Sequence, residues 1–193
     1  LQAFDTNEPS TNAVGAAVTI NEWMPFNRRF TTNNNGSYSG WLELRNAAAT
    51  NVGLGGWRVG RSSANSNEYV LSSATIVGGG HLLMWADKGS GGTNQHTGFE
   101  LATGGGEIAL FDSMARLVDA VEYPAVGSDK SGGRSLDGGV CETAYPTPGA
   151  SNNVFEISSA SVTNGAISLR TGTRKGHRYA VQYLSSLANT NWQ

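Results

Sequence analysis

The chain is poor in the residues that build disulfides, membrane spans and charged surfaces. Its 193 residues include one cysteine, Cys141, which excludes an internal disulfide and a cysteine-built zinc site. Charged residues make up 15% of the sequence, well below the ordinary quarter, which excludes a highly charged disordered chain. The net charge of −2 offers no basic surface for nucleic acid. No apolar run approaches the roughly 20 residues that a membrane span needs.

Glycine, by contrast, is abundant and divides the chain into short segments. There are 26 glycines, and clusters typical of turns stand at 53–56, 78–80, 89–92, 104–106 and 131–133. The runs between them alternate or are apolar throughout, and no 12-residue window has the period of a helix. These runs predict strands at residues 17–22, 41–46, 57–60, 69–71, 75–77, 81–87, 107–112 and 117–123. Short strands at roughly 10-residue spacing predict an all-β protein, an antiparallel β-sandwich.

The alternation within the runs also predicts which side chains form the core. In the run 41–46, Leu42 and Leu44 face one way, while Trp41, Glu43 and Arg45 face the other. The predicted core residues are Ile20, Leu42, Leu44, Trp57, Leu83, Ile108, Leu110 and Val121.

Three parts are expected along the chain. Residues 1–16 are polar without periodicity and are interpreted as a linker or flexible arm. Residues 17–152 form the sandwich, because Tyr145–Asn152 has two prolines and a glycine and reads as a boundary. Since the chain begins at Leu1 rather than at Met, we expect it to be a piece of a longer protein.

Residues 153–193 are predicted to form an incomplete β module. They hold three strand-like runs, at 154–162, 166–171 and 178–184, which are too few to bury a sufficient core alone. Their apolar side chains therefore need either the first domain or a second copy of the segment as a partner surface. A homodimer through residues 154–193 is one arrangement that supplies it. The side chains concerned are Ile157, Ile167, Leu169, Val181 and Tyr183.

Nine short motifs follow one another between residues 20 and 152. They are INEWM (20–24), WLELRN (41–46), GLGGWRV (53–59), GGGHLLMWAD (78–87), GFEL (98–101), GGGEIALFD (104–112), LVDAVEY (117–123), GRSLDG (133–138) and PTPGASN (146–152). The ordered set resembles the bacterial branch of the lamin tail domain family over residues 17–152. The resemblance implies an immunoglobulin-like sandwich and, in bacteria, a module of large secreted or surface proteins. The family is not known as an enzyme in its own right. Residues 154–193 resemble the first half of a small β-sandwich repeat.

One segment has the composition of an interaction surface. Residues 23–40 (WMPFNRRFTTNNNGSYSG) separate two predicted strands, and loops of this length are often functional. Aromatic residues and arginine are the types enriched at the centres of interfaces. The alternative is that Trp23, Met24 and Phe26 close one end of the sandwich and the Asn-rich tip is solvated. The candidate interaction residues are Trp23, Phe26, Arg28, Arg29, Phe30 and Tyr38.

Asp119 falls on the apolar face of a predicted strand, between Leu117 and Val121 and on the face of Tyr123. A carboxylate there must find donors or shift its pKa. It is either a general acid or base, or a structural group that accepts hydrogen bonds from backbone or pairs with Arg134. No second carboxylate is spaced to complete an acid–base pair, which favours the structural interpretation.

No other pattern indicates catalysis or a cofactor. The three histidines are His81, His96 and His177. None has a second ligand at metal-binding spacing, and no G-x-S-x-G motif is present. Loop residues Asp112, Asp129 and Asp137 could supply oxygen ligands to a structural calcium ion, although they lack a D-x-D-x-D spacing. Calcium is the one cofactor option left open. We therefore predict no catalytic residue and no metal ligand.

These observations predict a non-catalytic structural or interaction module of a larger exported multidomain protein, extracellular or in the cell envelope. Its partners would be other domains of the same polypeptide or a surface protein or polysaccharide, without nucleic acid or a membrane span. The alternative is a carbohydrate- or surface-polymer-binding module that positions a neighbouring catalytic domain. An exposed coplanar pair of aromatic rings would favour that alternative. A hydrolase would need clustered carboxylates or histidines, which the sequence does not offer.

Overall fold

The computed structural model describes residues 17–89, 96–134, 140–143, 146–152, 156–163 and 166–172. The chain divides into two compact units, Leu1–Asn152 and Asn153–Gln193. The described residues form strands, turns and bends and no helix. The strands described in the first unit are β1 (Val18–Met24), β2 (Gly40–Asn46), β3 (Val52–Gly53), β4 (Arg58–Gly60), β5 (Tyr69–Val70), β6 (Thr75–Ile76), β7 (His81–Ala86), β8 (His96–Thr97), β9 (Gly105–Phe111), β10 (Leu117–Pro124), β11 (Ser131–Arg134) and β12 (Val140–Thr143).

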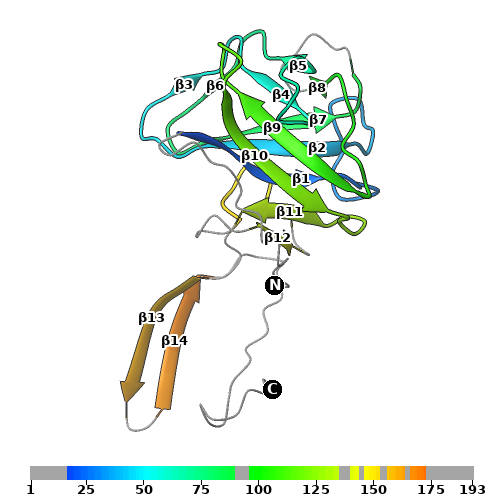
Figure 1. The fold of residues 1–193 in the computed structure, drawn as a ribbon. Helices are drawn as coiled ribbons and strands as arrows, with labels where there is room; N and C mark the ends of the chain where they lie inside the picture. Colours follow the sequence, from blue (N-terminus) through cyan, green and yellow to red (C-terminus); the bar gives the residue numbers. More distant parts are fainter. Residues whose placement is uncertain are drawn as a thin grey trace. The chain divides into compact units, whose positions relative to one another are not determined.

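Two sheets make up the first unit. One has the strand order β12-β11-β1-β2-β7-β8 and the other the order β10-β9-β4-β5, while β3 and β6 form a small ribbon. All pairs are antiparallel except β7 with β8. The second sheet lies across the first, with the green strands β9 and β10 crossing the blue strands β1 and β2 (Figure 1). The prediction of an immunoglobulin-like antiparallel sandwich is confirmed.

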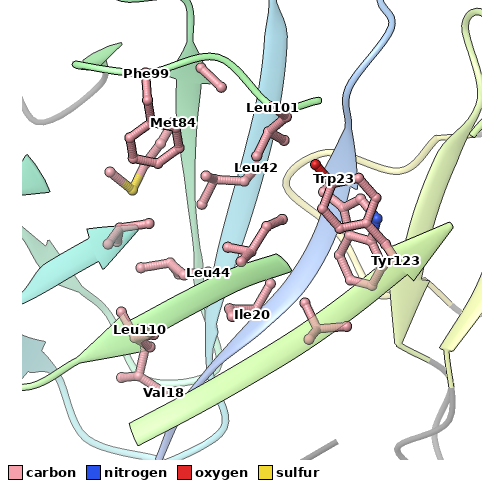
Figure 2. Close-up of a cluster of buried hydrophobic side chains, with 14 of the residues drawn as sticks. Val18, Ile20, Trp23, Leu42, Leu44, Met84, Phe99, Leu101, Leu110 and Tyr123 are labelled. Carbon is pink, nitrogen blue, oxygen red and sulfur yellow. The ribbon is translucent and has the colours of Figure 1, made fainter. Parts of the chain in front are cut away.

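Apolar side chains from both sheets meet between them. Figure 2 shows Ile20, Leu42, Leu44 and Leu110 converging in this layer, and all four are fully buried. Ile108 and Val121 also lie in this core cluster. Six of the eight predicted core residues are therefore buried.

The other two predicted core residues, Trp57 and Leu83, are only partly buried. Trp57 packs at the margin of the central cluster. Leu83 points to the opposite face of the first sheet, against a second cluster of Met24, Trp41 and Trp85. Since the first sheet buries side chains on both of its faces, alternation alone could not tell which face belongs to the central core.

A β-bulge at the start of β10 changes which side chains face the core. The register of β10 against β9 shifts between Leu117 and Asp119. Asp119, Val121 and Tyr123 consequently share the inner face, whereas Leu117 is 38% exposed. An extra residue reverses the alternation on one side of a bulge. The prediction that Leu117 lies on the face of Val121 is therefore wrong.

Two glycine clusters predicted to be turns belong to strands. Gly105 and Gly106 begin β9, and residues 131–134 form β11 beside β1. A Cβ atom on Gly132 would lie 2.4 Å from the indole nitrogen of Trp23. A Cβ atom on Gly133 would lie 2.8 Å from the side-chain amide nitrogen of Asn152. Glycine here permits a close approach within a strand rather than a change of direction.

The second unit contains a described hairpin, β13 (Glu156–Thr163) and β14 (Ala166–Gly172), paired antiparallel. These strands correspond to the first two runs predicted there. The third run, at 178–184, and the N-terminal arm, residues 1–16, lie outside the described residues. The predicted incompleteness of residues 153–193 and the homodimer stay predictions.

We predict that Leu44→Ala lowers the free energy of unfolding by about 2–5 kcal/mol, because it removes fully buried methyl groups and leaves a cavity. Leu117→Ala, the same change at an exposed leucine, should shift it by less than about 0.5 kcal/mol. Urea denaturation of both variants checks the assignment. Equal losses at the two sites would contradict it.

We also predict that Gly132→Ala destabilises the domain by about 1–3 kcal/mol, because the new methyl group overlaps the buried indole of Trp23. Gly104→Ala is the matched control, since a Cβ atom there meets nothing within 4 Å. Thermal denaturation compares the two, and a melting temperature for Gly132→Ala as high as that of the control would refute the close approach.

Candidate functional site

The segment Pro25–Ser39 joins β1 to β2 and is organised by its own asparagines. The side-chain amide of Asn27 donates to the carbonyl oxygens of Thr31 at 2.7 Å and Ser39 at 2.8 Å. Its side-chain oxygen accepts from the N–H of Phe30 at 3.1 Å. One buried side chain thus ties both ends of the segment together, as asparagine does in turns. We call residues 25–39 the aromatic–arginine loop.

Asn33 fixes the tip of the loop. Its side-chain oxygen accepts from the N–H groups of Asn35 at 2.9 Å and Ser37 at 3.0 Å. Its amide nitrogen donates to Asp87 Oδ2 at 3.0 Å, and the same oxygen lies 2.8 Å from Nδ1 of His96. Asp87, just after β7, therefore connects the loop tip to β8.

Asp129 holds the basic part of the loop. Its Oδ1 accepts from the N–H groups of Arg28 at 2.7 Å and Arg29 at 2.9 Å. Its own N–H donates to the carbonyl of Phe26 at 2.8 Å. Partial burial acts to raise the pKa of this carboxyl, but the two N–H groups, with Ser128 and Arg29, hold it below its ordinary value. Contacts within the domain itself thus hold the backbone of the loop in place.

The side chains of this ordered loop point outward. Phe26 is 40% exposed, Phe30 39% and Tyr38 52%. The Arg28 guanidinium lies 5.8 Å from the centre of the Phe26 ring, a cation–π distance. The Arg29 side chain is 86% exposed and reaches Asp129 at 3.4 Å. Five of the six predicted interaction residues are therefore accessible on one loop.

Trp23 is the exception, and its assignment to the interaction surface is wrong. It lies within β1, is fully buried, and packs against Tyr123 with the ring centres 6.0 Å apart (Figure 2). The loop begins two residues later than the sequence suggested, because β1 continues to Met24. Trp23 is a core residue.

Asp119 and Arg134 form a buried ion pair at 2.7 Å. Asp119 Oδ2 accepts from the N–H of Ile20 at 2.7 Å, and Arg134 Nε donates to the carbonyl of the same residue at 2.9 Å. Arg134 also donates to the carbonyl of Ala120 at 3.1 Å. Desolvation raises the pKa of Asp119 above its ordinary value, against the opposing effects of Arg134 and the Ile20 N–H. The pair satisfies backbone groups of two strands, which is a structural role.

A second buried polar cluster lies on the other face of the first sheet. Glu22 of β1 and Glu43 of β2 are opposite each other in register, and both are fully buried. Glu22 accepts from the Ser131 hydroxyl at 2.5 Å and from the N–H of Thr147 at 3.0 Å. Glu43 accepts from the Asn21 side chain at 2.7 Å and from the N–H of Gly149. The two carboxyl groups thus hold residues 146–152, which we call the latch segment.

Asn152 closes the far end of the latch segment. Its amide nitrogen donates to the carbonyl oxygens of Asn21 at 2.6 Å and Arg134 at 2.9 Å. Its side-chain oxygen accepts from Thr147 Oγ1 at 3.3 Å. Sequence reasoning missed Glu22, Glu43 and Asn152. The rule that singled out Asp119, a carboxylate in an apolar run, applies equally to Glu22 and Glu43 and would have found them.

Among the described residues, no group of three His, Cys, Asp or Glu side chains could hold a metal ion. Asp112 accepts from the N–H groups of Met114 and Arg116, and Asp129 from those of the loop, while Asp137 and His177 lie outside the described part. A shallow cleft of about 330 Å³ has Arg61 and Glu68 in its lining, and these two pair at 2.9 Å. The described residues form no helix, and so none that could cross a membrane.

Comparison with protein families shows that residues 11–125 match the model of the lamin tail domain family. The chain belongs to the lamin tail domain family. The family consists of non-catalytic immunoglobulin-like modules, in agreement with the sandwich seen here. No curated protein sequence matches the chain. In this lamin tail domain the matched range contains the aromatic–arginine loop and ends before β11 and the latch segment.

We predict that Arg134→Met costs about 3–5 kcal/mol of unfolding free energy, because it leaves the Asp119 carboxylate buried without its cation. Replacing a buried pair by apolar residues often restores stability. Here the free energy of unfolding of the double variant Asp119→Leu/Arg134→Met should stay about 1–3 kcal/mol below that of the wild type, because the N–H and C=O of Ile20 lose their hydrogen-bond partners.

Arg116→Met is the control for these variants, because Arg116 pairs with Asp112 on the surface and such pairs contribute about 0–1 kcal/mol. Guanidinium denaturation measures all three. Full recovery of stability in the double variant would contradict the backbone role of the pair.

Proposed function

We propose that this lamin tail domain is an interaction module of a larger exported multidomain protein, and that the aromatic–arginine loop is its contact surface. The observation that carries the proposal is the combination of a fixed backbone with exposed Phe26, Phe30, Tyr38 and two arginines. A preorganised loop loses little conformational entropy on binding. Rings and guanidinium groups are the side chains that most often carry binding energy at interfaces.

The charge of the loop favours a partner that presents carboxylates. Residues 25–39 contain Arg28 and Arg29 and no Asp or Glu, in a chain whose net charge is −2. Arg28 lies over a ring and Arg29 is mostly exposed, so both guanidinium groups can reach an acidic group. Other domains of the same polypeptide or a surface protein provide such groups beside apolar contacts. Export itself is supported by the resemblance to bacterial secreted modules.

The carbohydrate-binding alternative depends on an exposed platform of coplanar rings. The ring pair found among the described residues, Trp23 with Tyr123, is buried and tilted by 46°. The exposed rings of the loop are not stacked on each other in any described pair. No observation on the described residues therefore favours this alternative over a protein partner.

We predict that Arg28→Ala/Arg29→Ala/Phe30→Ala weakens binding to the neighbouring domains of the parent polypeptide by at least about tenfold, because it removes one ring and both cations. The matched control is Met114→Ala/Arg116→Ala, which removes an exposed apolar and an exposed basic side chain elsewhere. Calorimetric titration with the purified neighbouring domains compares the variants. Equal affinities for the loop variant and the wild type would refute the proposed surface.

A further inference from the structure

The two arginines of the aromatic–arginine loop stand in different surroundings, although both are exposed. Arg29 Nε lies 3.4 Å from Asp129 Oδ2, and the two side chains form an ion pair. The Arg28 guanidinium lies over the Phe26 ring instead, and no described carboxylate forms an ion pair with it. Both cations are within reach of a partner, but only one of them already has a carboxylate beside it.

One residue accounts for this difference. Asp129 Oδ1 accepts from the N–H groups of Arg28 and Arg29. The N–H of Asp129 donates to the carbonyl of Phe26. Because Asp129 holds the backbone at residues 26 and 28, the Phe26 ring and the Arg28 cation are kept side by side. Its second carboxylate oxygen, Oδ2, faces the Arg29 guanidinium.

The two arrangements leave the guanidinium donors in different states. The five N–H groups of a guanidinium lie in its plane, so a ring against its face does not occupy them. Arg28 can therefore bind a carboxylate through its edge while it stays over Phe26. At Arg29, Nε already faces Asp129, and a second carboxylate would meet the like charge of the first.

We propose that Arg28, stacked on Phe26, is the residue of this loop that binds a carboxylate of the partner, and that Asp129 keeps Arg29 paired within the domain. The inference rests on the proposed function and names the contact through which an acidic partner is recognised. Phe26 and Asp129 are then positioning residues, because they act on the partner through the two arginines.

Nuclear magnetic resonance titration of the full chain tests the assignment, with the capped peptide acetyl-Leu-Glu-Leu-amide as the probe. This peptide presents one carboxylate between two apolar side chains, and acetyl-Leu-Gln-Leu-amide is its uncharged control. We expect the Nε–H signal of Arg28 to shift more than that of Arg29, and neither the control peptide nor an equal concentration of chloride to reproduce the shift. A larger shift at Arg29, or none beyond the chloride effect, would overturn the proposal.

Two variants that remove the same charge from the same loop compare the positions. Arg28→Gln should weaken binding of the acidic peptide by about fivefold, whereas Arg29→Gln should weaken it by less than about twofold. Phe26→Leu should weaken it by about 2–5-fold, and Phe26→Tyr, which keeps a ring under the cation, should restore it. Equal effects of the two arginine variants, or no rescue by Phe26→Tyr, would contradict the roles assigned to Arg28 and Phe26.

Asp129→Asn examines the part played by Asp129. Asparagine keeps an oxygen that can accept the two N–H groups, and it tolerates the backbone φ of 59° found here, but it carries no charge. Arg29 should then become available, so binding of the acidic peptide should strengthen by up to about fivefold and the Arg29 Nε–H signal should shift as well. Unchanged or weaker binding would contradict the pairing role of Asp129.

Failure of this inference can be distinguished from failure of the proposed function. If the triple variant of the loop binds the neighbouring domains as the wild type does, the loop is not the contact surface, whatever the peptide shows. If that variant loses affinity while Arg28→Gln and Arg29→Gln weaken peptide binding equally, the surface stands and the assignment to Arg28 falls.

Discussion

A break in the hydrogen bonding of β1 is the constraint on which the rest of the domain depends. The register of β1 against β2 shifts between Ile20 and Glu22, and β11 pairs with β1 at Glu22 and Trp23. Asp119 and Arg134 take the place of a neighbouring strand, because they bind the N–H and the C=O of Ile20. Buried backbone groups must find partners, so β1 can stay in the middle of its sheet at this point. The same ion pair connects β1 to β10 of the opposite sheet.

The other buried charges and amides act in the same way. Glu22 and Glu43 accept backbone N–H groups of the latch segment, and Asn152 bonds both to the bulge residue Asn21 and to the carbonyl of Arg134. In the aromatic–arginine loop, Asn27, Asn33 and Asp129 play this part. A chain with few charged residues therefore places several of them where they satisfy backbone rather than solvent. Segments without regular structure are thereby fixed to the rest of the domain.

Periodicity and turn chemistry were sufficient to predict the fold class and ten of the fourteen described strands, because these depend on local patterns. Strands β3 and β8 are two residues long, and β11 and β12 have no alternating pattern of apolar residues. The sequence therefore did not predict these four strands. In β11 the residues are Ser-Gly-Gly-Arg, whose glycines are explained by Trp23 and Asn152, side chains remote in sequence. Leu117 was misplaced by a bulge and Trp23 by the length of β1. The composition of the aromatic–arginine loop was visible in the sequence, but its fixation by Asp129 and Asp87 requires the tertiary structure.

The Asp119–Arg134 pair is central because it completes the hydrogen bonding of β1. A scalar coupling across the hydrogen bond from the Ile20 amide nitrogen to the Asp119 carboxylate carbon reports that bond directly. Uniform ¹⁵N and ¹³C labelling and a long-range triple-resonance experiment detect it in the folded chain. The account predicts a resolved coupling and slow exchange of the Ile20 amide, as for a sheet interior. Rapid exchange of that amide, with no coupling to Asp119, would contradict it.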